Sequence, residues 1–580
     1  MRGSLTEEMK THKVAFALVA LATLARLILA AKTPVVCFTY ETFDDGLLLN
    51  YADSMAHGGW LGPYGRFTLV KNAGYPMIIA FAARTHIPYQ VMFMLLWVIA
   101  CTVAARALEP LVRDVRVRLG VYLVLLWIPV LFMYNFFERT YRFGIVLPFV
   151  LGIFAGYFGL YLRRDRPARQ LVPWSVLAGL TLAYFYLIME SSKWVLPFVA
   201  GCSVVCFVLW VLDLHRKRIA VRGLVARAAL LALPLAMLWG WCTLEAGVND
   251  HFYGVRINNN RTQGSYSQVI ARLATIDAGE TNRDVVISRV ALGQALDASP
   301  TLAQMRDAVW TAWDAWGTAY NNWDKPEGST EVPGDIGYWA LMDAYDAAYH
   351  YTDGRAQEAY WAQICDELGA AFADGRLLRK EGLTISGGTQ PMTAEDVAPW
   401  LQETFAFGRK LAFYQADGTM VDAYVIGQAR TEDILERQRY IRGLLGGNAI
   451  TDDPSDAVYV ESHDFLAREA TVGRALVQVH RALVFVALAA AALLLCRDIR
   501  KKDRDGLRTA LLAAALLLST FVLVAGVVWS VGYFMRQMPA VRDSAFSSYA
   551  GACYVLFCYV ECILIGRVAD VAVDAKRERA

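Results

Sequence analysis

Two adjacent carboxylates, Asp44 and Asp45, are the residues of this chain best suited to chemistry. They open an amphipathic pattern over residues 46–57, in which apolar side chains recur at helical spacing. Paired carboxylates can act as a general base, bind a divalent metal such as Mg²⁺ or Mn²⁺, or do both. The alternative is helix capping, which contributes about 1 kcal/mol and requires only one aspartate. The residues alone leave capping and catalysis equally open.

Basic side chains that suit phosphate oxygens occur in three other segments. Lys71 follows the aspartates in the stretch TLVKNAGYP, and Arg139 and Arg142 lie three residues apart in FFERTYR. Arg536 lies in YFMRQMP. The alternatives are a lysine that contacts lipid headgroups and an interfacial belt of aromatic and basic anchors. We expect these four residues to gather on one side of a membrane.

Four more residues are candidates for substrate contact or for a structural role, namely His57, Tyr64, Glu138 and Glu190. Glu190 lies in the short segment ESSKW, where it could simply pair with Lys193.

Charged and thiol side chains also occur inside apolar segments. Arg26 and Glu561 are costly in lipid, so each should face the protein interior, and the two could pair with each other. Most of the ten cysteines lie in apolar runs, and the spacings at Cys202/Cys206 and Cys553/Cys558/Cys562 only superficially resemble metal sites. Since no histidine or carboxylate cluster accompanies them, we expect small membrane-buried residues.

The composition indicates an integral membrane protein. The chain has 580 residues, of which 56% are apolar, and its mean hydropathy is +0.34. The net charge of +2 is nearly balanced and suggests no nucleic-acid partner.

Ten segments approach the roughly 20 residues that cross about 30 Å of hydrocarbon. The first, Val14 to Ala31, is expected to be an anchor and not a cleaved signal. If the N-terminus is cytoplasmic, the loops predicted to be cytoplasmic carry the excess of Lys and Arg. This places both termini in the cytoplasm and the Asp44 loop, residues 32–88, outside it. The segments are 14–31, 89–108, 118–135, 144–162, 172–189, 194–212, 224–244, 479–496, 508–533 and 546–566.

The stretch Ala73 to Ala83 is apolar but only about half a span long. Counting it as a crossing would reverse the charge pattern of every later loop. We therefore predict an interfacial or re-entrant helix.

A second long polar region, residues 248–474, shows helical periodicity and is predicted to be a mainly helical extracytoplasmic domain. In it, the spacing of Trp310, Trp313 and Trp316 favours a helix core over a sugar-stacking platform. The expected organisation is a module of seven spans over 1–247, this domain, and three spans over 475–580. The fold class is an all-α polytopic membrane protein with interfacial helices in the first external loop.

The residues now described resemble the C-type (GT-C fold) membrane glycosyltransferases, which include protein O-mannosyltransferases, the lipid A aminoarabinose transferase and oligosaccharyltransferases. The likeness lies in an acidic pair after the first span, here Phe43-Asp44-Asp45, and in a lysine before a proline-containing apolar segment, here Lys71 to Pro76. The stretch from Asp44 to Pro76 also looks like an uncharacterised bacterial branch with the pattern DDxxxxxxAxxxxxGxWLGPYxxxTLxKxxxYP. Weaker similarity extends through ERTYR, MESSKW and the Asp335 to Ala340 motif.

The resemblance implies a sugar donor linked to a polyprenyl phosphate and an acceptor hydroxyl or amine outside the cytoplasm. Asp44 or Asp45 would take the acceptor proton in a single inverting displacement, with or without a divalent metal. Lys71, with Arg139, Arg142 or Arg536, would hold the donor phosphate.

Two other functions fit parts of the sequence. Ten spans with buried charges would suit a transporter or flippase for lipid-linked sugars, although no inverted repeat is visible. The 248–474 region could instead be a membrane-anchored module that binds a cell-surface glycan, for which ten spans are excessive.

Overall fold

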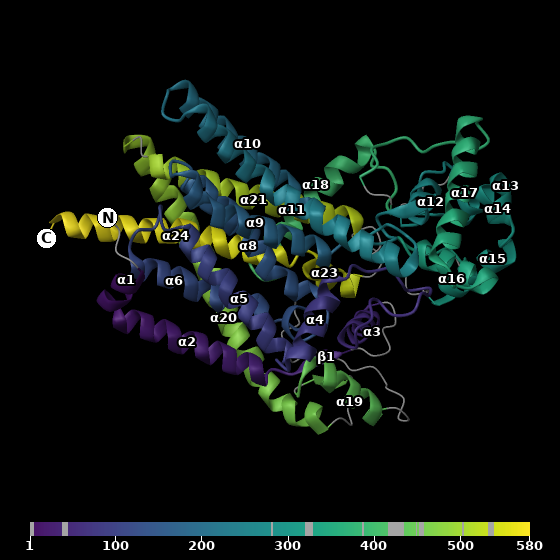
Figure 1. The fold of residues 1–580 in the computed structure, drawn as a ribbon, viewed down its shortest axis with the longest axis horizontal. Coiled ribbons are helices and arrows are strands. Elements are labelled where there is room, and N and C mark those ends of the chain that lie inside the picture. The colour runs from purple at the N-terminus through teal and green to yellow at the C-terminus, as the bar shows by residue number, and fades with distance from the viewer. Residues whose placement is uncertain are drawn as a thin grey trace.

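The structure, a computed structural model, confirms the all-α polytopic architecture (Figure 1). It describes residues 5–37, 44–279, 282, 284–319, 329–385, 388–415, 434–447, 449–451, 457–501, 504–531 and 539–579. Within these residues, ten helical segments are long and apolar enough to cross a membrane, and they coincide with the ten predicted segments. They comprise α2 (Lys13–Lys32), α5 (Tyr89–Ala107), α6 (Val115–Leu126) with the 3-10 turn η1 (Pro129–Phe132), α8 (Arg142–Leu162), α9 (Ala168–Ile188), η2 (Ser192–Val195) with α10 (Leu196–His215), α11 (Val221–Tyr253), α20 (Ala457–Lys501), α21 (Arg504–Ser530) and α24 (Ala552–Arg579).

Helix α8 lies at the centre of the bundle and packs against α5, α9, α10 and α24. Nearly all of its residues are buried. A Cβ at Gly156 or Gly159 would collide with Ala178 or Trp174 on α9, so these glycines permit the close contact of the two helices. The central helix is thus fixed on its neighbours, and its first turn carries Arg142 toward one end of the bundle.

The Asp44 loop folds into two short helices, α3 (Asp45–Ala56) and α4 (Gly74–Thr85). With 12 residues, α4 is too short to span, as predicted for the stretch from Ala73 to Ala83. The two faces of α3 belong to different hydrophobic cores. Leu48 and Ala52 pack with the membrane bundle, whereas Leu47 and Tyr51 pack with a second core. The loop therefore packs between the membrane bundle and the second hydrophobic core.

That second core is formed mainly by six helices after α11 (Figure 1). Trp313 is fully buried in it, and Trp310 and Trp316 are packed against it, so the tryptophan series belongs to a helix core as predicted. The six helices are α12 (Gly264–Ala274), α13 (Arg289–Ala298), α14 (Pro300–Ala303), α15 (Arg306–Ala319), α16 (Gly337–Tyr349) and α17 (Gly354–Ala373).

The chain then returns to the bundle. Helix α18 (Ala394–Ala412) packs on α21 and α24, and α19 (Ile434–Leu445) packs on α4. Strand β2 (Ala449–Thr451) pairs in parallel with β1 (Val35–Cys37), a two-stranded sheet that the sequence did not predict. Residues of the predicted 248–474 domain thus contribute to both cores.

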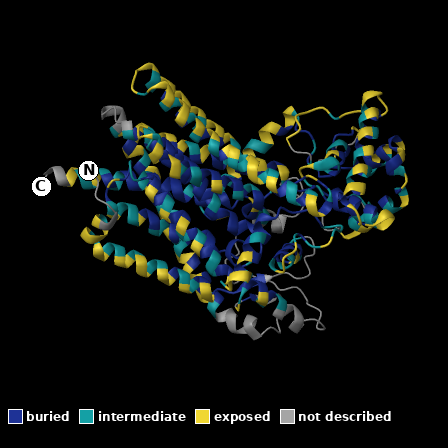
Figure 2. Ribbon diagram, in the orientation of Figure 1, coloured by how far each residue is buried: buried dark blue, intermediate teal, exposed yellow. Residues whose placement is uncertain are grey.

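The remaining helices are short: α1 (Leu5–Thr11), α7 (Tyr134–Phe137) and α23 (Pro539–Tyr549). Both chain ends lie at the left of Figure 1, whereas α3, α4 and the helices α12–α17 lie toward the opposite end. The dark-blue core runs along the bundle between them (Figure 2). The assignment of these ends to the two sides of the membrane stays a prediction from the charge pattern.

Candidate active site

Strand β1 brings two distant segments together at the end of the bundle. Val36 donates its N–H to the carbonyl of Glu138 (2.9 Å), and Thr140 donates its N–H to the carbonyl of Val36 (2.8 Å). Residues 138–140 therefore lie beside β1, which precedes α3 by only a few residues. This backbone pairing aligns Arg139 with the start of α3.

Asp45 is held by Arg139. The guanidinium donates to the carboxylate from Nε (3.0 Å to Oδ2) and from Nη2 (2.9 Å to Oδ1). The Asp45 side chain is fully buried and that of Arg139 is 18% exposed. Burial alone would lower the pKa of Arg139, but the adjacent Asp45 charge raises it well above its usual value. This pair has the two-pronged geometry of a strong, positioned ion pair.

Asp44 has different partners. Its Oδ1 accepts from Lys71 Nζ (2.8 Å) and from the Tyr141 hydroxyl (3.1 Å). The Lys71 side chain is 6% exposed, but that of Asp44 is 36% exposed. Asp44 occupies the N-cap position of α3, yet its side chain makes no capping bond, so the capping interpretation is wrong for this residue. Of the two aspartates, Asp44 is therefore the one that solvent or a ligand can reach.

The charges around Asp44 determine its protonation state. Burial raises the pKa of this carboxyl, but the positive charge and hydrogen bond of Lys71, aided by Arg139 and Arg142, lower it well below the usual range. Asp44 is thus an anion at neutral pH.

A third ion pair completes the group. Arg142 Nη1 donates to both oxygens of Glu190 at 2.7 and 2.6 Å. Glu190 thus pairs with the buried Arg142, whereas Lys193, the partner that the sequence suggested as possible, is exposed. Burial opposes the charge on Glu190, but Arg142 and Lys71 lower its pKa. The Nε atom of Arg142 is buried and, among the described residues, has no hydrogen-bond partner.

Tyr141 lies among the three cations. Its ring centre is 4.8 Å from the guanidinium carbon of Arg139, 5.5 Å from that of Arg142 and 5.9 Å from Lys71 Nζ. These distances suit cation–π attraction. Tyr141 is recognisable in the sequence only as part of FFERTYR, whereas in the structure it is the common neighbour of the site cations.

The polar segment that follows α11 is the main feature of the site that was not predicted from the sequence. The segment Asn258-Asn259-Asn260-Arg261 lies against the Lys71 loop, with Asn259 Nδ2 donating to Asn72 Oδ1 (2.6 Å). Arg261 pairs with Asp335, and its guanidinium lies 4.6 Å from the ring centre of Tyr338. A run of three asparagines and an arginine directly after a span was the available signal.

Several predicted candidates lie elsewhere. His57 is exposed and contacts Asp53 at 3.2 Å. Tyr64 packs with the second core and donates to Gln357. Glu138 is buried and contributes its backbone carbonyl to the β1 contact. Arg536 lies outside the described residues.

Arg26 and Glu561, a pairing that the sequence left open, have other partners in the structure. Arg26 donates to the carbonyl of Leu131 (3.0 Å) and lies 4.5 Å from the ring centre of Phe132. Glu561 lies beside His480 and Cys558 in a buried group that the sequence did not reveal. His480 is too far away in the sequence to have been recognised as a neighbour.

The acidic pair does not fit a Mg²⁺ or Mn²⁺ site. Each carboxylate is bound by a cationic side chain of the protein, and Arg139 occupies both oxygens of Asp45. A divalent ion prefers several oxygen ligands free of such competition. We therefore derive no step through a metal at this position.

Fold and site together define a polytopic helical membrane protein with a cluster of three ion pairs at one end of its bundle. No protein-family model matches the chain, and no relative among the curated proteins does. Solved structures that it resembles include ArnT from Cupriavidus metallidurans in the apo state and bound to undecaprenyl phosphate. The identities are 11% and 12%, the TM-scores are 0.30 and 0.28, and each alignment covers 96% of this chain and 78% of ArnT. At these scores the likeness establishes no activity for this chain.

Proposed function

We propose that the protein is a membrane glycosyltransferase that moves a sugar from a polyprenyl-phosphate-linked donor to an extracytoplasmic acceptor. The observation that carries the proposal is the unequal pair of aspartates. Asp44 is a half-buried anion held on Lys71 and Tyr141, whereas Asp45 is fully buried on Arg139. One carboxylate is open to a substrate, and its neighbour is fixed as a support.

Lys71 is the proposed ligand of the donor phosphate. An ammonium group has three donors, so Lys71 can keep Asp44 and still bind a phosphate oxygen. The Arg142 Nε atom, buried without a hydrogen-bond partner among the described residues, is a second donor nearby. Cationic donors fixed around a leaving phosphate stabilise the charge that develops on it.

Asp44 is the proposed base. The acceptor oxygen or nitrogen attacks the anomeric carbon, its proton passes to an Asp44 oxygen, and the bond from that carbon to the phosphate oxygen breaks with both electrons on the phosphate. A single displacement of this kind inverts the anomeric configuration. Asp45 acts in this proposal as a positioning residue that holds Arg139.

As long as Lys71 binds Asp44 and no donor phosphate, the low pKa of Asp44 makes this carboxylate a weak base. A donor phosphate on Lys71 would share the ammonium charge and repel the carboxylate, and both effects raise the pKa of Asp44. Donor binding would therefore strengthen the base when an acceptor can react.

The deciding experiment compares envelope glycans of cells that carry the protein, lack it, or carry Asp44→Asn. We expect a sugar modification that disappears in the last two. The same transfer should then be measured with purified protein in detergent, using the lipid fraction of those cells as donor. A flippase has no activity in detergent, because no membrane separates two compartments there. A glycan change in cells, combined with no sugar transfer by the purified protein, would therefore contradict the proposal and support translocation.

A further inference from the structure

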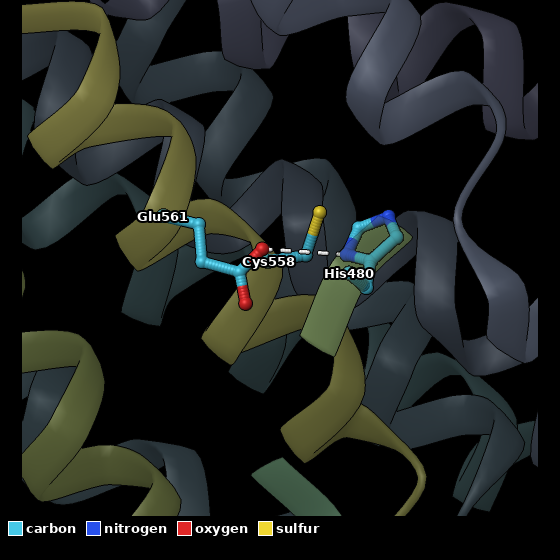
Figure 3. Close-up of side chains that lie close together, drawn as sticks. All are labelled: His480, Cys558 and Glu561. Carbon is cyan, nitrogen blue, oxygen red and sulfur yellow. Dashed lines mark ion pairs between the residues drawn. The ribbon is translucent and has the colours of Figure 1, made fainter. Parts of the chain in front are cut away.

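Three potential metal ligands meet between two spanning helices, away from the ion-pair cluster (Figure 3). His480 comes from α20, and Cys558 and Glu561 come from α24, where they are three residues apart and share a face. One donor atom of each lies within 4.8 Å of the others. His480 Nδ1 and Glu561 Oε2 are 3.3 Å apart.

These side chains are buried and poorly satisfied. The side chains of His480 and Glu561 are 4% and 7% exposed, and Cys558 is 1% exposed. Within the described part of the chain, neither His480 Nδ1 nor Glu561 Oε2 has a hydrogen-bond partner. A carboxylate inside the apolar part of a bundle is costly unless something compensates its charge. The arrangement therefore calls for a further partner.

We propose that His480, Cys558 and Glu561 bind a zinc-class divalent cation that links α20 to α24. Imidazole, thiolate and carboxylate are all zinc ligands. A dication bound by one thiolate, one carboxylate and a neutral imidazole has no net charge, which suits an apolar surrounding. Binding displaces the thiol proton of Cys558 and any proton shared by His480 and Glu561.

The size of the cluster agrees with this ligand. Zinc lies about 2.0–2.3 Å from such atoms, so two ligands of one ion are at most roughly 4 Å apart. Because the three donor atoms lie within 4.8 Å of one another, only small side-chain movements would bring them to the distances between ligands of one zinc ion. Three protein ligands leave a fourth position for water or another small ligand.

A groove gives access to this cluster. It has a volume of about 930 Å³ and lies between α20, α21 and α24, with the end of α18 at its wall. Its lining is apolar except for Thr509 and the single charged residue Glu561. The carboxylate is thus the point at which a metal or its fourth ligand would enter.

The competing explanation is a neutral pair in which one proton is shared by His480 and Glu561. The two explanations differ in metal content, which can be measured without reference to activity. Full-length protein should be purified in detergent after growth with zinc, and its metal content determined by elemental analysis. We expect about one zinc per chain, removable by a strong chelator and restored by Zn²⁺ alone. Zinc near the background level after reloading would overturn the proposal.

Matched cysteine variants assign the ligand. Cys558→Ser should lose most of the zinc, whereas Cys562→Ser, one turn further along α24 and also buried, should retain it. Equal zinc in both variants would contradict the site. If Cys558→Ser fails to fold, the wild-type protein loaded with Co²⁺ decides, because thiolate ligation gives a near-ultraviolet charge-transfer band and a site without thiolate does not.

Discussion

The ion-pair cluster around Tyr141 and the His480 cluster between α20 and α24 differ in how buried charge is compensated. Around Tyr141, Asp44, Asp45 and Glu190 each accept hydrogen bonds from a cationic side chain of the chain itself. Inside the bundle, Glu561 lies 3.3 Å from His480, which carries a positive charge only when it is protonated. The carboxylates around Tyr141 are compensated by cations of the chain itself, whereas the charge of Glu561 would need a ligand or a proton.

The two aspartates of the cluster also differ in their exposure, although they are adjacent in the sequence. Asp44 and Asp45 differ by one position, yet one is 36% exposed and the other fully buried. Asp44 is the N-cap and has non-helical backbone angles, whereas Asp45 is the first residue of α3, and the two side chains reach different partners. An acidic pair can therefore combine one reacting and one supporting carboxylate.

The largest expected effect is that of Asp44→Asn. Asparagine keeps the size and can still accept from Lys71, but it cannot take a proton. We expect sugar transfer to fall by about 10²–10⁴-fold, the usual contribution of a general base. Expression and thermal unfolding should stay close to wild type. The matched control is Asp53→Asn on the same helix, and equal activity in the two variants would remove Asp44 from the mechanism.

Asp45→Asn should act mainly through stability. Removing one partner of a buried ion pair leaves Arg139 uncompensated, which typically costs about 3–5 kcal/mol. Denaturant unfolding in detergent measures this loss. Replacing both partners, as in Asp45→Leu with Arg139→Met, should recover part of it, because no charge is then left buried alone. If Asp45→Asn unfolds like wild type, the supporting role is contradicted.

The pH dependence tests the link between Lys71 and Asp44. A lowered pKa means that Asp44 contributes stability above its unfolded pKa and loses it as pH falls through the folded pKa. The acid limb of kcat/KM, which reports free enzyme, should lie below the ordinary aspartate range, and that of kcat should lie at higher pH. In Lys71→Gln, the largest of the effects that oppose burial is lost and Arg139, Arg142 and the Tyr141 hydroxyl remain, so the limb of kcat/KM should move upward. Coincident limbs in wild type would contradict the proposed strengthening of the base.

The sequence predicted what depends on local pattern. Span length and hydropathy located the ten segments of the described residues that are long and apolar enough to cross a membrane, and the half-length of the stretch from Ala73 to Ala83 identified α4 as too short to span. The acidic pair, Lys71 and the two arginines of FFERTYR were likewise found from residue type. Each of these signals lies within one short stretch of chain.

Contacts between distant segments could not be predicted in this way. The β1–β2 pairing joins residues more than 400 positions apart, and the unequal burial of Asp44 and Asp45 depends on Arg139, which is placed by Val36. The Arg261–Asp335 pair and the approach of His480 to Cys558 are equally non-local. The residue pattern within one segment does not indicate which distant segment will pack against that segment.

The smallest expected effect is that of His57→Ala. This variant tests whether every polar residue of the Asp44 loop contributes to the site or only those in the ion-pair cluster. His57 follows the last residue of α3, and its side chain is 78% exposed and contacts only the half-exposed Asp53 among the charged groups described. Exposed substitutions of this kind change stability by less than about 0.5 kcal/mol. Transfer should stay within about twofold of wild type, because no proton or phosphate contact is lost. A loss as large as that of Asp44→Asn would show that the site extends to the far end of α3, and the division between reacting and supporting residues would have to be redrawn.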